Sequence, residues 1–172
     1  MQRSITLDGA TSFGVSQNLR MNLDALDKKL LRVLQDDGRL TNADLAQRIG
    51  LSPSACLRRL QRLEEHGVIE GYSATLSGEA IGKAMTVFIE VTLDSQVGKA
   101  LDAFERAVAA CDDVLECHLM SGDFDYLLRV AVADMRDYER VHRQQVAAFP
   151  HVARIRTAFV MRSVLGRRGY AL

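Results

Sequence analysis

Arginine side chains cluster in one short segment whose apolar residues recur at the spacing of an α-helix. When positions advance by about 100° per residue, Leu57, Leu60 and Leu63 point one way, and Arg58 and Arg62 fall nearly opposite. A guanidinium group presents a planar fork of donors that fits phosphate oxygens and the acceptor edge of guanine. The pattern therefore predicts a helix that packs through leucines and offers arginines to the major groove of DNA.

The residues before this helix favour a second helix joined to it by a tight turn. Gly50 suits a helix C-terminus, Ser52 can cap the next helix, and Pro53 occupies a first-turn position where no N–H donor is needed. This arrangement is typical of a helix-turn-helix unit. The residues predicted to contact DNA are Ser52, Ser54, Ala55, Arg58, Arg59 and Arg62.

The surrounding sequence extends the unit to three helices and a wing. An apolar helical pattern upstream ends near Gly38, and Thr41 with Asp44 resembles a capping box that opens the next helix. Downstream, residues 67–72 place β-prone side chains around glycines, as a short wing would. A winged helix-turn-helix domain is predicted, whereas an ordinary amphipathic surface helix with solvated arginines is the alternative.

After residue 84 the pattern changes to strands alternating with helices. Apolar residues alternate over 87–93, which predicts a strand, and recur at helical spacing over 101–111. Residues 114–120 and 126–132 then resemble the two strands of a β-hairpin.

One further helix and one further strand complete the second half. Asp134 can cap a helix that Pro150 closes, and a last strand is predicted over 152–164. The order βαββαβ implies an α+β ferredoxin-like sandwich with two helices on one sheet face. The other face needs cover, which a second copy of the chain would provide, so a homodimer is expected.

These patterns divide the chain into five parts. The expected parts are a mobile extension (1–20), a winged helix-turn-helix domain (21–72), a linker with a short strand at its beginning (73–83), a ferredoxin-like domain (84–165) and a C-terminal tail (166–172).

Composition narrows the class of protein. The formal net charge is +0, so DNA binding has to rely on a local patch. The three cysteines, Cys56, Cys111 and Cys117, lie within apolar patterns and lack the spacing of metal ligands, so no metal site is predicted. Since no apolar run approaches the roughly 20 residues of a membrane span, and the N-terminus lacks a secretory pattern, a cytoplasmic protein without a membrane partner is inferred.

Several motifs in order give the chain a family resemblance. They are Leu26-Asp27, Asp37-Gly-Arg39, Gly50-Leu-Ser-Pro53, Cys56-Leu57 with Arg59, Arg62-Leu-Glu64, Gly67-Val-Ile69 and Glu116-Cys-His-Leu-Met-Ser-Gly-Asp-Phe-Asp-Tyr-Leu-Leu128. With them the chain resembles the Lrp/AsnC, or feast/famine, transcription regulators, and most closely the leucine-responsive branch. The resemblance implies an amino-acid effector bound between subunits of a dimer or of a higher ring such as an octamer. By position, it assigns the effector response to Leu119, Gly122, Asp123, Asp125, Met135, Ala158, Phe159 and Val160.

The chemistry of these residues suits a free amino acid. Backbone amides around Gly122 can approach a carboxylate, Asp123 or Asp125 can accept from an ammonium, and Met135 offers an apolar wall. The alternative for residues 122–125 is a plain turn whose aspartates bond local amides. Because Ala158 is smaller than the residue common in the family, the effector can be leucine or another apolar amino acid.

Two other functions remain alternatives. One is an architectural DNA-binding protein that ignores effectors, since its DNA-binding domain would look the same. The other is an enzyme that binds amino acids, although the sequence shows no phosphate-binding glycine loop, no metal-ligand cluster and no nucleophile beside a base, so no catalytic residue is predicted.

Overall fold

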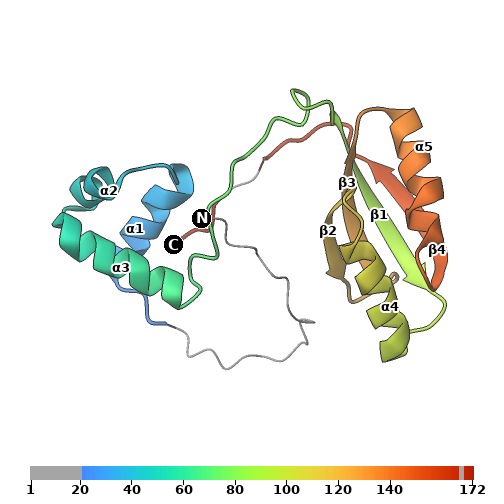
Figure 1. Cartoon of the computed structure of the whole chain (residues 1–172), viewed down its shortest axis with the longest axis horizontal. Coiled ribbons are helices and arrows are strands. Elements are labelled where there is room, and N and C mark those ends of the chain that lie inside the picture. Colours follow the sequence, from blue (N-terminus) through green and yellow to red (C-terminus); the bar gives the residue numbers. More distant parts are fainter. Residues whose placement is uncertain (1–20, 167–168) are drawn as a thin grey trace. The chain divides into compact units, whose positions relative to one another are not determined.

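The computed structural model describes residues 21–166 and 169–172, which form two compact units (Figure 1). The first unit holds the described residues up to Ser73 together with residues 169–172, and the second spans Ala74–Gly166. The extension predicted for residues 1–20 lies outside the described residues.

The first unit is built from three helices with polar caps. Helix α1 (Ala25–Asp36) is capped by Asp24, α2 (Asn42–Ile49) by Thr41 and α3 (Pro53–Glu65) by Ser52. Each cap side chain accepts a hydrogen bond from an amide of the first turn, which satisfies a donor that the helix leaves free. Between α2 and α3, Gly50 has φ 79°, a left-handed conformation that suits glycine. The core is the apolar set Leu30, Leu31, Leu45, Ala46, Ile49, Cys56 and Leu63.

The wing has no strand among the described residues. Gly67 has φ 67°, and the amide of Val68 donates to the Leu63 carbonyl at 2.9 Å, which ends α3 in a turn. Val68 and Ile69 then pack against the helices. The predicted β structure over 67–72 and the short strand at the start of the 73–83 linker are wrong, because no described segment runs beside them to form a ladder.

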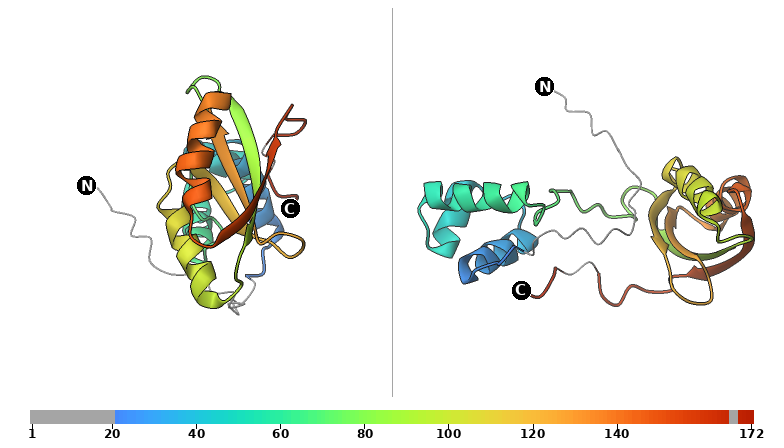
Figure 2. Two further views of the ribbon diagram at one scale, coloured as in Figure 1. Left: turned by 90° about the vertical axis from the view of Figure 1, so that its right-hand side faces the viewer. Right: turned by 90° about the horizontal axis from the view of Figure 1, so that it is seen from below.

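The second unit is a four-stranded antiparallel sheet in the order β2-β3-β1-β4. Its strands are β1 (Met85–Leu93), β2 (Val114–Leu119), β3 (Tyr126–Val132) and β4 (Val152–Phe159). Helices α4 (Gly98–Ala109) and α5 (Met135–Gln144), with the short 3₁₀ turn η1 (Val146–Ala148), cover one sheet face (Figure 2). This is the predicted α+β ferredoxin-like arrangement.

Alternate strand residues form the core between the sheet and the helices. Val87, Ile89 and Val91 of β1 are fully buried, and the tilted rings of Phe104 and Tyr126 have their centroids 4.5 Å apart. The opposite sheet face carries partly exposed side chains.

The last strand is shorter than predicted. It ends at Phe159 rather than at residue 164 because its partner β1 begins at Met85. Phe159 pairs with Val87, and one more hydrogen bond joins the Val160 amide to the Thr86 carbonyl, at 3.1 Å. Only Met85 of β1 lies beyond that point, so the neighbouring strand ends one residue later.

Candidate DNA-binding and effector sites

The packed face of α3 differs from the one that its leucines predict. Cys56 and Leu63 are fully buried, whereas 43% of Leu57 is exposed. The apolar side is therefore centred on Cys56 and Leu63, about 50° round the helix, or half a residue, from the direction that Leu57, Leu60 and Leu63 predict.

Two of the three arginines of α3 are bound within the unit. Arg59 contacts Asp24 at 2.7 Å and Asp27 at 2.8 Å, and Arg62 contacts the other oxygen of Asp27 at 2.7 Å. Asp27 is fully buried near the start of α1, so these ion pairs hold α3 against α1. The Asp27 amide and the Arg59 guanidinium lower the pKa of Asp24 below its usual value. Arg62 is therefore paired with Asp27 although 45% of its side chain is exposed, and Arg59 is turned toward α1. The DNA contacts predicted for both arginines stay predictions.

The outward stripe of α3 is Ser54, Arg58 and Gln61, which are exposed and spaced by four and three residues on one side of the helix. Arg58 has no ion pair among the residues that the structure describes. Ser52 lies at the N-terminus of the helix, where its hydroxyl accepts from the Ala55 amide at 3.3 Å.

Gln61 is a candidate that the sequence analysis missed. Its carboxamide offers the donor and acceptor pair that matches an adenine edge. Placing the packed face on Cys56 rather than on Leu57 would have identified it.

The predicted effector residues fall into two groups, of which the first lies at the β2–β3 turn. Gly122 has φ 144°, and Asp123 is exposed. Asp125 is only 8% exposed, and its two oxygens accept from the Leu93 amide and from the Gln96 side chain, both at 2.7 Å. Asp125 thus joins the turn to the end of β1, and Asp123 is the carboxylate that solvent can reach.

The second group lies where α5 begins and β4 ends. It comprises Met135, Ala158, Phe159 and Val160, all of which are exposed. Phe159 meets the ring of Tyr138 edge-on at 5.0 Å. Met135, Tyr138 and Thr157 line a mainly apolar hollow of about 610 Å³ beside this group.

One chain does not bring the two groups together. In the β1–β3 register, Tyr126 next to the turn pairs with Val91, whereas Val132 next to α5 pairs with Met85. At about 3.3 Å per residue, these ends of the sheet are about 20 Å apart. An amino acid is too small to bridge that distance.

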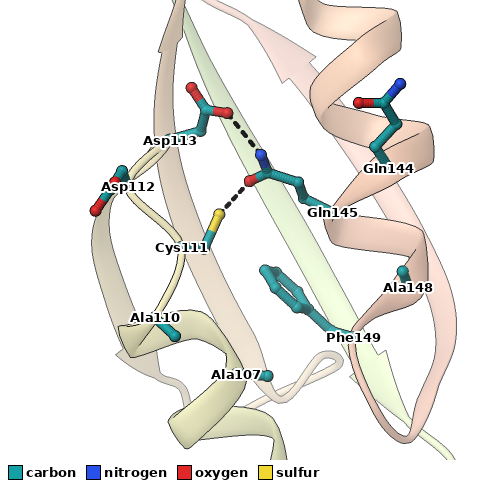
Figure 3. A pocket seen from close by; sticks show the side chains of 9 residues that line it. All are labelled: Ala107, Ala110, Cys111, Asp112, Asp113, Gln144, Gln145, Ala148 and Phe149. Atoms are coloured by element: carbon teal, nitrogen blue, oxygen red, sulfur yellow. Dashed lines mark hydrogen bonds between the residues drawn. The ribbon is translucent and has the colours of Figure 1, made fainter.

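A second hollow of about 470 Å³ lies between the C-terminal ends of α4 and α5 (Figure 3). Gln145 crosses it, accepting from the Cys111 thiol and donating to Asp113 at 2.8 Å. Asp113 also pairs with Arg140 at 3.1 Å. No predicted effector residue lines this hollow, and the described part of the chain contains no cluster of His, Cys, Asp and Glu that would hold a metal.

Both units match families of known proteins. Residues 23–70 match the winged helix-turn-helix DNA-binding family, and residues 86–170 match the Lrp/AsnC ligand binding domain. The chain belongs to the Lrp/AsnC family. It is a transcriptional regulator with a DNA-binding unit and a ligand-binding unit.

Curated Lrp/AsnC relatives are similar over most of their length. The Bkd operon transcriptional regulator of Pseudomonas aeruginosa is 45% identical over 145 residues, which is 84% of this chain and 95% of the relative. The leucine-responsive regulatory protein of Escherichia coli is 41% identical over 143 residues, covering 83% and 87%.

Solved Lrp/AsnC structures share the fold. A Neisseria meningitidis transcriptional regulator in complex with L-methionine matches with a TM-score of 0.80 at 35% identity, covering 84% of this chain and 94% of that one. The feast or famine regulatory protein of Mycobacterium tuberculosis, also complexed with L-methionine, matches with a TM-score of 0.76 at 33% identity, covering 87% and 99%. Within the described residues no helix is long and apolar enough to cross a membrane.

Proposed function

We propose that this Lrp/AsnC protein is a cytoplasmic regulator that reads DNA with the outward stripe of α3 and changes its DNA affinity or assembly when an apolar amino acid binds. Arg58 would contact a guanine edge or a phosphate, and Ser54 and Gln61 would flank it. Arg59 would hold α3 in place through its ion pairs. Arg62 would keep its ion pair with Asp27 and could also donate to a phosphate, because 45% of its side chain is exposed.

The observation that carries the effector proposal is the separation of the two groups along the sheet. Since one chain holds them about 20 Å apart, an amino acid that touches both has to sit between two copies. The turn of one copy would bind the polar end of the ligand through the amides near Gly122 and through Asp123. The hollow beside Met135 in the other copy would take the apolar side chain.

The site therefore requires a homo-oligomer. We propose a dimer closed over the open sheet face, with dimers assembling into a ring such as an octamer. That face carries Phe88 and Leu127, which are partly buried in one chain, beside the Arg129–Glu116 ion pair at 2.6 Å. A second copy would cover them.

A thermal-shift screen of the common amino acids tests the effector class, since a ligand selective for the native state raises the unfolding temperature. Leucine, methionine or a similar apolar amino acid is expected to stabilise the protein and to change its affinity for an operator selected from random duplexes. A flat response in both assays, with DNA binding retained, would favour the effector-independent architectural protein. Turnover of an amino acid would favour the enzyme.

Mixing two variants tests whether the site is shared between copies. Asp123→Ala at the turn and Met135→Glu at the hollow should each weaken amino-acid binding when either variant is tested alone. After unfolding and refolding together in equal amounts, about a quarter of the sites would combine an intact turn with an intact hollow from different copies. A mixture that binds no more ligand than the separate variants would contradict a shared site. Asp112→Ala, an exposed acid outside both groups, is the matched control.

A further inference from the structure

Residues 169–172 lie against α1 of the DNA-binding unit, and we call them the return segment. The Gln35 carboxamide makes two hydrogen bonds with the Tyr170 backbone: its nitrogen donates to the carbonyl at 3.1 Å, and its oxygen accepts from the amide at 2.5 Å. One turn earlier on α1, the Arg32 guanidinium donates to the Leu172 backbone oxygen, with a distance of 2.7 Å from Nε.

The shape of the return segment fits this surface. A Cβ atom on Gly169 would lie only 2.7 Å from the Gln35 side-chain oxygen and 3.0 Å from the Gln35 Cβ, so a glycine permits the close approach. Leu172 is half-buried and packs against the apolar core of the three helices. Close approach, paired backbone groups and an apolar anchor are the features of a bound peptide.

The chain passes between the two units twice, once at Ser73–Ala74 and once before the return segment. The segments that lead to both passages leave the sheet at the same end, because the start of β1 and the end of β4 are neighbours in the register. The second group of predicted effector residues, Met135, Ala158, Phe159 and Val160, lies at that end. Lys83, which precedes β1, forms an ion pair at the same end: its Nζ lies 3.1 Å from Oδ2 of Asp137 in the first turn of α5.

We propose that the return segment is a clasp that binds α1 and gives the DNA-binding unit a second tether to the ligand-binding unit. A single flexible tether leaves a domain free to sample many positions, whereas closing a loop with a second attachment reduces that freedom. A ligand that shifts the end of the sheet beside Met135 moves the points from which both tethers leave the sheet. The clasp then transmits the shift to α1, and this role in coupling rests on the proposed function.

The clasp itself is tested without DNA or amino acid, by the hydrogen exchange of the Tyr170 amide in the full chain. Gln35→Ala removes its acceptor, and Gly169→Val forces the segment away from α1. Each variant is expected to raise the exchange rate about tenfold, the factor that one hydrogen bond of ordinary strength would give. Gln144→Ala, an exposed glutamine of α5, is the matched control and should leave the rate unchanged. Equal rates in wild type and both variants would overturn the clasp.

The coupling role is tested by operator affinity with and without the amino acid. In wild type, a ratio of about 5 to 150 is expected. Gln35→Ala and Gly169→Val should leave the affinity without ligand within about twofold, since neither residue is on the outward stripe, and should bring the ratio close to one. Variants that keep the wild-type ratio would overturn the coupling role. If wild type itself responds to no amino acid, the proposed function fails and the coupling role with it, while Tyr170 exchange still decides the clasp.

Discussion

Replacing Asp27 with asparagine tests whether the buried carboxylate holds α3 in its position. Asp27 is fully buried and accepts from the Asp24 amide at 3.2 Å, from Arg59 at 2.8 Å and from Arg62 at 2.7 Å. Loss of one partner of a buried ion pair costs about 3 to 5 kcal/mol. Because 45% of the Arg62 side chain and 23% of the Arg59 side chain are exposed, solvent screens part of that cost. We expect the unfolding free energy of the DNA-binding unit to fall by about 2 to 4 kcal/mol.

The assay for Asp27→Asn has to resolve the two units. Hydrogen exchange measured peptide by peptide should show faster exchange throughout α1, α2 and α3, with β1 and β3 unchanged as an internal reference. Thermal unfolding of the first unit should shift down by at least about 8 °C. Asp36→Asn makes the same chemical change at an exposed position of α1 and should alter stability by less than about 0.5 kcal/mol. If both variants behave alike, the ion pairs do not hold the helices together.

Further predictions concern the ligand-binding unit. Asp125→Ala should lower the unfolding free energy of that unit by about 1 to 3 kcal/mol because the turn loses its buried acceptor, whereas Asp123→Ala should weaken ligand binding with no change in urea midpoint. The reverse pattern would mean that their roles are exchanged. Burial raises the pKa of the Cys117 thiol to about 11, so iodoacetamide should modify it at least about tenfold more slowly at pH 8 than it modifies a free cysteine, because the smaller thiolate fraction outweighs the higher nucleophilicity of that thiolate. Mass spectrometry showing the rate of a free thiol would contradict this. The Ala133 amide and neighbouring cations hold the pKa of Asp137 well below its usual range, so its stabilising contribution is present above about pH 4 and is lost as the pH falls through the lowered value. Asp137→Asn should therefore lower the urea midpoint at pH 7 more than at pH 3, and an equal decrease at both would exclude this linkage.

The sequence predicted the elements well because their signals are local. Thr41, Ser52 and Asp134 are helix caps in the structure, and apolar alternation identified β1. The β2–β3 hairpin follows from its short polar turn. These features depend on neighbours within a few residues, which the sequence displays directly.

The sequence could not predict the contacts that form between residues far apart in the chain. Arg59 and Arg62 pair with Asp27, which lies 32 and 35 residues away, so helical spacing alone could not show that they are occupied. The hydrogen bonds of Asp125 with Leu93 and Gln96 depend on how the turn meets β1, so the sequence could not show them, and the part of Asp125 in the effector response stays a prediction. The separation of the two effector groups likewise follows from strand register, which a single sequence does not specify.

The most direct test of DNA reading by α3 is the operator affinity of Arg58→Ala across a salt series. Arg58 makes no ion pair within the described chain, so the variant should unfold at the wild-type temperature. Operator affinity should fall by about 1 to 3 kcal/mol, with relaxed sequence preference if Arg58 contacts a base or a salt slope smaller by about 0.9 if it contacts a phosphate. Wild-type affinity, preference and salt slope in this variant would contradict the account.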